Sequence, residues 1–535
     1  METHIDSFWI FALHSQYHDL SLPNLLLLLL LFATTWLLRA LSRWAYPGGP
    51  AWGRHRHHCP DNSSDGGNPN SVPIPGPRGL PVLGSMHLMH GLAHRRLAAA
   101  AARHRAGRLM AFSLGETRAV VASDPDVARE ILNGSAFADR PMKESAYGLM
   151  FDRAMGFAPY GQYWQVLRRV AARHLFSPKE VGAGEARRRA IAEQMVSAVV
   201  DHGGASFHVR DITSRASLNN MMGSVFGREY ELLHENEETR ELRALVEEGY
   251  DLLGKLNWSD HLPWLAGLDP QRVRFRCSEL VPRVNRFVGR IIQEHKGRTG
   301  PRSADFADVL LSLEGHDKLS DHDAIAVLWE MIFRGTDTVA VLIEWILARM
   351  VLHPHIQSRV HEELDRIVGR SQPLMESDLQ STPYLSAVVK ETLRLHPPGP
   401  LLSWARLAVV DTTVGGYHVP AGTTAIVNMW AITRDPKVWE DPLEFAPERF
   451  VGGDNAEAGF SVFGSDMRLA PFGSGRRVCP GKALGLTTVT YWVGRLLQEF
   501  EWAQVDHSPV NLSEVLRLSC EMVNPLTVKA SPRRS

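Results

Sequence analysis

The sequence is poor in cysteine. Only four cysteines occur in 535 residues, and none of them forms a C-x-x-C pair with another: Cys59, Cys277, Cys479 and Cys520. Such wide spacing argues against a disulfide framework and against a four-cysteine zinc site. We therefore expect a reducing compartment, where each cysteine must be explained by its own surroundings.

The chain also lacks an excess of charge of either sign. Its 58 basic and 59 acidic residues leave a formal net charge of -1, so the overall balance gives no indication of a nucleic-acid partner. Internal repeats and the dinucleotide fingerprint G-x-G-x-x-G are absent as well. The stretch after Cys479 is too short for an appended flavin or nicotinamide domain, so any electrons must come from another protein.

One long hydrophobic run interrupts this ordinary globular composition. Residues 20–38 contain no charge and include seven consecutive leucines, and about 20 such residues cross a bilayer as a helix. Acidic residues precede the run while Arg39 and Arg43 follow it, which favours a cytosolic body. We expect a lumenal segment at 1–19 and a single transmembrane anchor at 20–38. A removed signal peptide and a buried core helix are the alternatives.

The remaining sequence divides into a linker and one large body. Residues 39–71 are rich in Gly, Pro, Ser, Asn and His, a composition that predicts a flexible linker. In the body, 72–535, two apolar runs around Gly115 predict a β-hairpin over 109–122, and 414–428 predict a second small β region. Helical spacing prevails over most of the stretch between them. The expected fold class is therefore mainly α with small sheets.

The stretch PFGSGRRVCPGKALG, from Pro471 to Gly485, places one cysteine in a glycine-rich turn. Cys479 lies just before an apolar helix pattern, and a helix N-terminus with Arg476 and Arg477 nearby favours the thiolate form. On these residues alone three roles stay open: a nucleophile, a redox-active cysteine, or an axial ligand to a haem iron.

The same stretch matches F-x-x-G-x-R-x-C-x-G, the signature of the cytochrome P450 superfamily, at all five fixed positions. These are Phe472, Gly475, Arg477, Cys479 and Gly481. The chain resembles that family from about Val72 to the C-terminus. The resemblance implies the P450 fold and a haem b whose iron takes the Cys479 thiolate as its axial ligand.

Two further motifs follow the family's order. KETLR supplies Glu391 and Arg394, and FAPERF supplies Arg449. The resemblance implies that these three side chains form a buried charged network, in which two guanidiniums match one carboxylate. An exposed i, i+3 ion pair is the alternative.

Residues 320–354 predict one very long helix with Ser320 as its N-cap. The poor helix formers Gly335-Thr336-Asp337-Thr338 in its middle predict a local distortion. This cluster resembles the family's oxygen-activating groove, which implies that Thr338 donates a hydrogen bond to dioxygen and that Asp337 relays protons. A core helix softened by Gly335 is the alternative.

One residue departs from the family pattern. The position before Gly335 is usually small, and here it is Arg334. A long cation there either points away from the haem or remodels the groove, and the sequence leaves both possibilities open.

The resemblance also implies groups that bind the haem propionates, since carboxylates need cationic or hydrogen-bonding partners. By position in the family pattern these are Trp164, Arg168, Arg406 and Arg477. The expected reaction is insertion of one oxygen atom from O2 into a C–H bond of a small apolar substrate. Electrons would come from NADPH through cytochrome P450 reductase, which could dock on the basic residues Arg169, Arg173, Arg476 and Lys482.

FRGTDTVA and LHPPGPLLSWARL resemble the plant microsomal A-type subfamily associated with organ and seed growth. That resemblance implies an endoplasmic reticulum protein in contact with membrane lipid, acting on a fatty acid or lipid-derived growth signal. A haem-thiolate isomerase or dehydratase is an alternative function, although Asp337 and Thr338 are retained. A non-catalytic haem sensor is a second one.

Overall fold

The computed structural model describes residues 22–58, 72–232, 236–297, 305–451, 460–506 and 509–533. Helices dominate this part of the chain. In chain order they are α2 (Leu22–Trp44), α3 (Pro50–His58), α4 (Ala93–Arg103), α5 (Pro125–Asn133), α6 (Glu144–Gly148), α7 (Gln162–His174), α8 (Pro178–Ala183), α9 (Glu185–Asp201), α10 (Val209–Phe226), α11 (Glu237–Gly254), α12 (Val273–Gly297), α13 (Phe306–Leu311), α14 (Asp321–Leu352), α15 (Pro354–Ile367), α16 (Pro383–Leu395), α17 (Met429–Ile432) and α18 (Lys482–Glu499).

The strands are short and form small sheets. They are β1 (Leu109–Leu114), β2 (Thr117–Ala122), β3 (Phe207–His208), β4 (Arg406–Leu407), β5 (Thr412–Val414), β6 (Tyr417–Val419), β7 (Thr424–Val427), β8 (Phe500–Gln504), β9 (Glu514–Leu516), β10 (Cys520–Met522) and β11 (Thr527–Pro532). The largest sheet has the order β1-β2-β7-β4. The expected fold class, mainly α with small sheets, is confirmed.

Both predicted β regions meet in this largest sheet. β1 and β2 pair as an antiparallel hairpin, and β7 lies parallel to β2 with Ala119 opposite Thr424. β4 then pairs with β7 and places Arg406 opposite Ala425. The helix after the hairpin begins where Asp124 accepts hydrogen bonds from two backbone amides, as expected of an N-cap.

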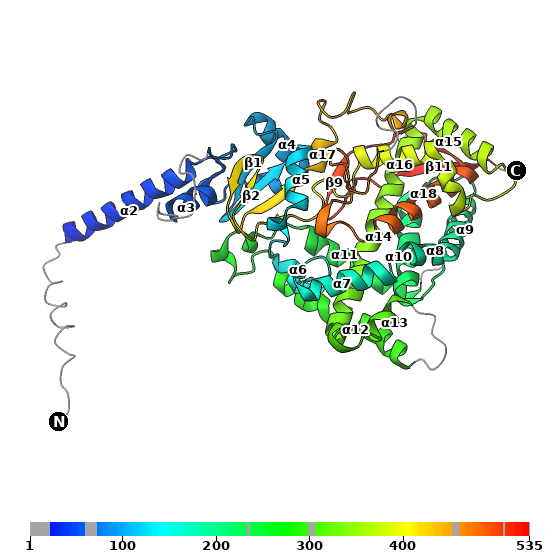
Figure 1. The fold of residues 1–535 in the computed structure, drawn as a ribbon, viewed down its shortest axis with the longest axis horizontal. Helices are drawn as coiled ribbons and strands as arrows, with labels where there is room; N and C mark the ends of the chain where they lie inside the picture. Colours follow the sequence, from blue (N-terminus) through cyan, green and yellow to red (C-terminus); the bar gives the residue numbers. More distant parts are fainter. Residues whose placement is uncertain are drawn as a thin grey trace.

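The long α14 crosses the middle of the body, with α10 and α18 on its sides (Figure 1). Its N-cap is Ser320, whose hydroxyl accepts the Asp323 amide at 3.1 Å, as predicted. Most of its side chains are buried among Trp, Phe, Ile and Leu from both halves of the core. A helix of 32 residues that is apolar nearly all round is stable only in such an interior.

The predicted distortion within α14 is wrong, since the helix is uninterrupted from Asp321 to Leu352. Neighbouring helices support the weak cluster from the side. Ser217 on α10 donates to the Thr336 carbonyl at 2.5 Å, and Tyr250 on α11 donates to the Phe333 carbonyl at 2.6 Å. Tertiary packing therefore overrides the poor helix propensity of these residues.

The linker prediction needs a correction in its first part. α2 continues to Trp44, six residues beyond the expected end of the anchor, and α3 occupies 50–58. Ala51 and Trp52 are buried, and the Trp52 indole donates to the Phe112 carbonyl of β1 at 3.1 Å. These apolar contacts fix a segment whose composition alone suggested flexibility. The later part, 59–71, lies outside the described residues.

Candidate active site

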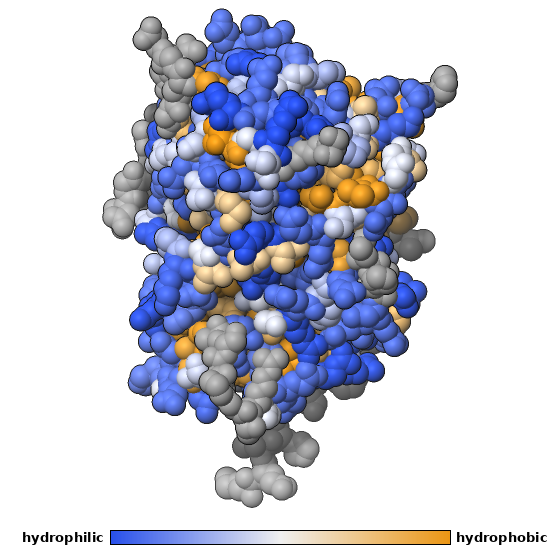
Figure 2. Space-filling model, turned by 90° about the vertical axis from the view of Figure 1, so that its right-hand side faces the viewer, coloured by the Kyte–Doolittle hydropathy of each residue, from blue (hydrophilic) through white to orange (hydrophobic). Residues whose placement is uncertain are grey.

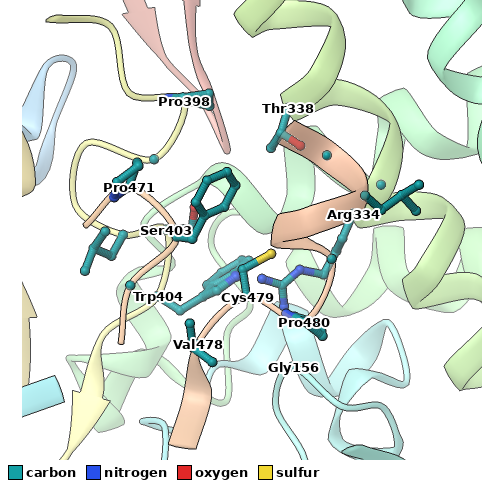
Figure 3. Close-up of a pocket in the computed structure, with 18 of the residues that line it drawn as sticks. Gly156, Arg334, Thr338, Pro398, Ser403, Trp404, Pro471, Val478, Cys479 and Pro480 are labelled. Atoms are coloured by element: carbon teal, nitrogen blue, oxygen red, sulfur yellow. The ribbon is translucent and has the colours of Figure 1, made fainter. Parts of the chain in front are cut away.

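A cavity lies between α14 and the glycine-rich turn that carries the cysteine (Figure 3). α7, α10, α11 and the turn between β9 and β10 complete its wall, together with the chain from Pro398 to Arg406. Apolar side chains make up much of the lining: Met155, Phe176, Met221, Met331, Leu342, Leu402, Trp404 and Leu518. The cavity is therefore lined largely by apolar side chains from separate segments of the chain.

The turn holds Cys479 by its backbone. The Cys479 amide donates to the Phe472 carbonyl at 3.0 Å, and α18 begins three residues later at Lys482. Gly475 has φ +67°, and a Cβ there would lie 2.2 Å from the Leu132 carbonyl oxygen. Only glycine fits this close approach. Phe472 and Gly481 also line the cavity, so the signature residues shape the wall around the sulfur.

Cys479 is the one cysteine among the described residues that faces the cavity. Cys277 packs in the core, and Cys520 donates its thiol to Glu514. Burial raises the pKa of both of these thiols. Cys59 lies outside the described residues.

The groups of the protein alone do not favour the thiolate form of Cys479. Burial raises the pKa of Cys479, and the opposing effects come from Arg334, the Gly481 amide, Arg168 and Lys482. Arg477 turns away and donates to the carbonyls of Ala138 and Ala158. A desolvated thiol becomes a thiolate when a cation binds it directly, so this sulfur suits a metal ligand better than a free nucleophile.

The predicted propionate residues line the same cavity from three elements. Trp164 and Arg168 come from α7, Arg406 from β4 and Arg477 from the cysteine turn. Arg168 donates to the Val478 carbonyl at 2.9 Å, and Arg406 donates to the Ser474 carbonyl at 3.1 Å. The Trp164 indole is engaged with the Met155 carbonyl at 3.0 Å.

The structure adds Arg140 to this group. Sequence reasoning missed this residue, because nothing local links it to the cysteine turn. Its guanidinium donates to the carbonyls of Gly156, Trp404 and Ala405 at 2.7–3.2 Å. Burial and repulsion from the other cavity arginines lower the pKa of Arg140 well below its usual value.

Charge in the cavity is strongly unbalanced. Five arginines line it, Arg140, Arg168, Arg334, Arg406 and Arg477, against a single carboxylate, Glu330. Burial, with repulsion from Arg477 and Arg168, lowers the pKa of Arg406 to about 9. Buried cations in excess are costly unless an anion joins them. A haem fits this arrangement, since its two propionates are anions and its iron takes the sulfur.

Of the residues predicted on α14, two line the cavity and one does not. Thr338 and Gly335 line it, and a Cβ on Gly335 would approach the Met221 side chain to 2.5 Å. Asp337 lies outside the lining, near Ser519 and Arg210. Burial raises the Asp337 pKa, while those neighbours lower it. Thr338 and Asp337 are consecutive on α14, and of the two only the alcohol lines the cavity.

Arg334 is directed into the cavity, which answers the question left open by the sequence. Its side chain points toward Cys479 (Figure 3). Nη1 donates to Glu330 at 3.4 Å, and the guanidinium lies 5.5 Å from the centre of the Trp404 ring. Arg334 therefore adds a cation to the groove where the family usually has a small residue.

The charged network lies away from the cavity, with Glu391 and Arg394 fully buried and Arg449 at its partly exposed edge. Arg394 donates to both oxygens of Glu391 at 2.7 Å, and Arg449 donates to the same carboxylate at 3.2 Å. Glu391 and Arg394 are 0% exposed. Arg394 also binds the carbonyls of Thr433, Pro442 and Glu444, so it ties α16 to the chain between α17 and residue 449.

Fold and cavity together define a haem-thiolate protein, and a comparison with family models agrees. The model described as Cytochrome P450 matches residues 74–522, and the chain belongs to this family. A zebrafish cytochrome P450 solved with progesterone has a TM-score of 0.70 at 27% identity, covering 82% of this chain and 99% of its own. The protein is a cytochrome P450 monooxygenase that uses haem with an axial cysteine.

Comparison with curated proteins finds plant cytochromes P450 of the 78A group at 60% identity or more. The chain is 63% identical to Cytochrome P450 78A9 of Arabidopsis thaliana, covering 100% of this chain and 99% of the relative. It is 60% identical to Cytochrome P450 78A3 of Glycine max over the whole of both chains. Flavonoid 3'-monooxygenase of Arabidopsis thaliana is 35% identical over 87% of this chain and 92% of its own.

Proposed function

We propose that this protein is a membrane-anchored monooxygenase in which Cys479 is the axial haem ligand. The observation that carries the proposal is the cavity itself. Cys479 lies on one wall and Thr338 on α14 lies across from it, with apolar side chains between α14 and the Pro398–Arg406 segment. This arrangement suits a reaction in which a buried C–H bond is held beside a metal centre.

Each residue of the chain has a defined task in this proposal. Arg168, Arg406 and Arg477 hold the propionates through charge-assisted hydrogen bonds, with Trp164 packed against two of these guanidiniums. When bound, haem would supply the oxygen chemistry: one atom of O2 would enter a C–H bond of the substrate and the other would leave as water, with two electrons and two protons consumed. The Gly481 amide directed at the sulfur tunes the electron density of the thiolate.

Proton delivery is assigned to two neighbouring residues of α14, Asp337 and Thr338. The Thr338 hydroxyl lies in the cavity and donates a hydrogen bond to dioxygen. Burial raises the pKa of Asp337, which lies near Ser519 of the cavity wall and within electrostatic reach of Arg210 and Arg517. It therefore holds a proton more readily than an exposed carboxyl and can pass it toward Thr338 through solvent.

The electron donor we propose is NADPH–cytochrome P450 reductase, because membership of the cytochrome P450 family implies a redox partner. Arg173 and Arg476 are exposed, and Lys482 is half-buried beside the Phe463 carbonyl. Arg169 forms an ion pair with Asp317 at 2.6 Å. The proposed docking site therefore consists of the exposed cations Arg169, Arg173 and Arg476, with the charge of Arg169 partly offset by Asp317.

Membrane attachment is supported by α2 and by the surface near its base. Residues Leu26–Trp44 form a helix long and apolar enough to cross a membrane. Exposed apolar side chains continue from there onto the body: Leu80, Val82, Leu83, Trp258, Trp264 and Leu268. Hydrogen bonds join their segments, from Gly115 to Leu83 and from Glu116 to His261. The opposite face is mostly hydrophilic, with apolar residues in small separate groups (Figure 2).

We place the protein in the endoplasmic reticulum membrane, with 1–19 in the lumen and the catalytic body from residue 72 in the cytosol. Arg39 and Arg43 at the cytosolic end of the helix favour that orientation. The proposed substrate is an apolar fatty acid or lipid-derived growth signal, delivered from the membrane surface. Oxygen insertion into such a molecule gives a product with one hydroxyl group.

The test compares lipids in membranes that carry the full chain or its Cys479→Ala variant, supplied with reductase, NADPH and 18O2. We expect a lipid that gains one 18O atom only with the full chain. Conversion without O2 or NADPH would instead indicate the isomerase or dehydratase. An intact thiolate-ligated haem with no conversion of any lipid would indicate the sensor.

A further inference from the structure

Arg334 is the cavity arginine with the weakest partners. Among the described residues it makes one hydrogen bond, to Glu330 at 3.4 Å, and its side chain is 33% exposed toward the cavity. Glu330 itself is 1% exposed, and its oxygens take the Gly156 amide at 2.8 and 3.0 Å. The short hydrogen bonds of this carboxylate therefore go to the backbone. Most of the Arg334 guanidinium remains available to bind another group.

The other cavity arginines are accounted for without Arg334. Arg140 binds three carbonyls, while Arg477 binds carbonyls and Asp139. Arg168 and Arg406 each make one hydrogen bond to a carbonyl, which leaves donors for the propionates. Nothing comparable is assigned to Arg334.

The charge of the occupied site identifies what is missing. A ferric iron, a porphyrin dianion and the Cys479 thiolate carry no net charge together, so haem brings only its two propionates. With Glu330 and Asp139 these make four negative charges against five guanidiniums. One positive charge is left in a desolvated place, where an unpaired ion is costly.

Around Arg334 the wall is apolar, with Trp404, Met331 and Met221 among its lining. We infer that Arg334 is the specificity-determining residue of this cavity and binds the anionic end of a substrate that carries one negative charge on an apolar body. A carboxylate fits best, because it pairs with a planar guanidinium through two parallel hydrogen bonds. A phosphate monoester would bring about two negative charges and leave the site with an excess of anion.

Glu330 has a complementary task in the empty cavity. It holds Arg334 loosely at 3.4 Å and keeps the guanidinium positioned until a stronger partner arrives. Burial raises the pKa of Glu330, whereas Arg334 and the Gly156 amide oppose that rise. The ion pair between i and i+4 on α14 thus orients the cation without satisfying it.

This inference rests on the proposed function, and binding tests it separately from turnover. The haem-loaded full chain is titrated with decanoate, decanol and decyltrimethylammonium, and each dissociation constant is read from the spin-state shift of the Soret band. We expect decanoate to bind at least about tenfold more tightly than decanol, as a charge-assisted hydrogen bond contributes that much. The cationic probe should bind weakest.

Variants locate the effect. Arg334→Met should weaken decanoate binding about tenfold and leave decanol within twofold, whereas Arg334→Lys should restore part of the preference. Arg283→Met is the matched control, because Arg283 also pairs with a glutamate, Glu248 at 3.0 Å, but outside the cavity. The double variant E330Q/R334M removes both charges if the single change leaves Glu330 unpaired and the fold fails.

The outcomes separate the two proposals. Decanol binding as tightly as decanoate, an unchanged preference in Arg334→Met, or no decanoate shift in a chain with the thiolate Soret band would overturn the inference alone. Loss of 18O insertion with the charge preference intact would overturn the proposed function and leave the role of Arg334 standing.

Discussion

Two groups of buried arginines in this molecule are satisfied in opposite ways. Arg394 lies in an ion pair with two 2.7 Å bonds to Glu391, and Arg449 shares the same carboxylate. Around the cavity, five guanidiniums face one carboxylate and bond mostly to carbonyls. Charge matched within the chain holds the fold together, while charge left in excess marks the place where a ligand completes the structure.

The difference also explains where each group lies. The Glu391 network joins α16 to the segment before residue 450, and no part of it lines the cavity. The cavity arginines sit on α7, α14, β4 and two turns, so their side chains converge from separate elements. Burial, together with repulsion among them, lowers the pKa of Arg406 to about 9, and bound anions would raise it again.

The largest effect is expected in the cavity, when its cysteine is removed. Cys479→Ala removes the sulfur and keeps every cation, so haem should lose its axial thiolate and activity should fall to background. The readout is the thiolate-type Soret band of the reduced, carbon monoxide-bound protein. Cys277→Ala, in the core, is the control and should keep the band. A thiolate band in Cys479→Ala would mean that another cysteine ligates the iron.

Breaking the Glu391 network should lower the stability of the fold and leave the ligand site intact. Glu391→Gln leaves Arg394 and Arg449 without an anion in a fully buried place, at a cost of about 3–5 kcal/mol in the free energy of unfolding. Denaturant unfolding of the purified full chain in detergent measures it. Glu248→Gln breaks a half-exposed pair with Arg283 and should cost about 1 kcal/mol or less. Equal losses in both variants would refute the contrast.

Removing one arginine of the cavity should weaken haem binding much more than it lowers the free energy of unfolding. Arg406→Gln is expected to speed haem transfer to apomyoglobin by roughly tenfold, because one propionate loses a charged partner. Unfolding of the protein should change much less than in Glu391→Gln. Arg283→Gln serves as the surface control. A normal haem transfer rate would show that Arg406 does not reach a propionate.

Local signals in the sequence were enough for much of the fold. The hairpin at 109–122 and the Ser320 cap depend on neighbouring residues, and each is where it was predicted. The helix α3 was missed, because Trp52 is fixed by β1, which lies 60 residues away in the chain. Distant contacts of this kind leave no trace in composition.

The site shows the same division. The cysteine turn is one short motif and could be found by its pattern, whereas Arg140 and Glu330 reach the cavity from unrelated segments. The groups that act on Cys479 were mispredicted for a related reason. Proximity of Arg476 and Arg477 in sequence says nothing about where their guanidiniums point, and burial decides the pKa of the thiol.

The smallest predicted effect comes from a substitution that changes no charge in either group of arginines. Thr338→Val keeps the shape of a cavity side chain and removes its hydroxyl. We expect normal haem binding and substrate affinity, with coupling of NADPH consumption to product reduced several-fold, since proton delivery contributes roughly 10²–10⁴ in such steps and water replaces part of it.

Thr336→Val is the matched control for this change. Thr336 is buried two residues earlier on α14 and does not line the cavity. Its variant should therefore couple NADPH to product as the unchanged chain does, while Thr338→Val releases more hydrogen peroxide per NADPH. Equal coupling in the two variants would place proton delivery elsewhere than the cavity face of α14, and would leave the contrast between matched and unmatched arginines intact, because neither variant alters a charge.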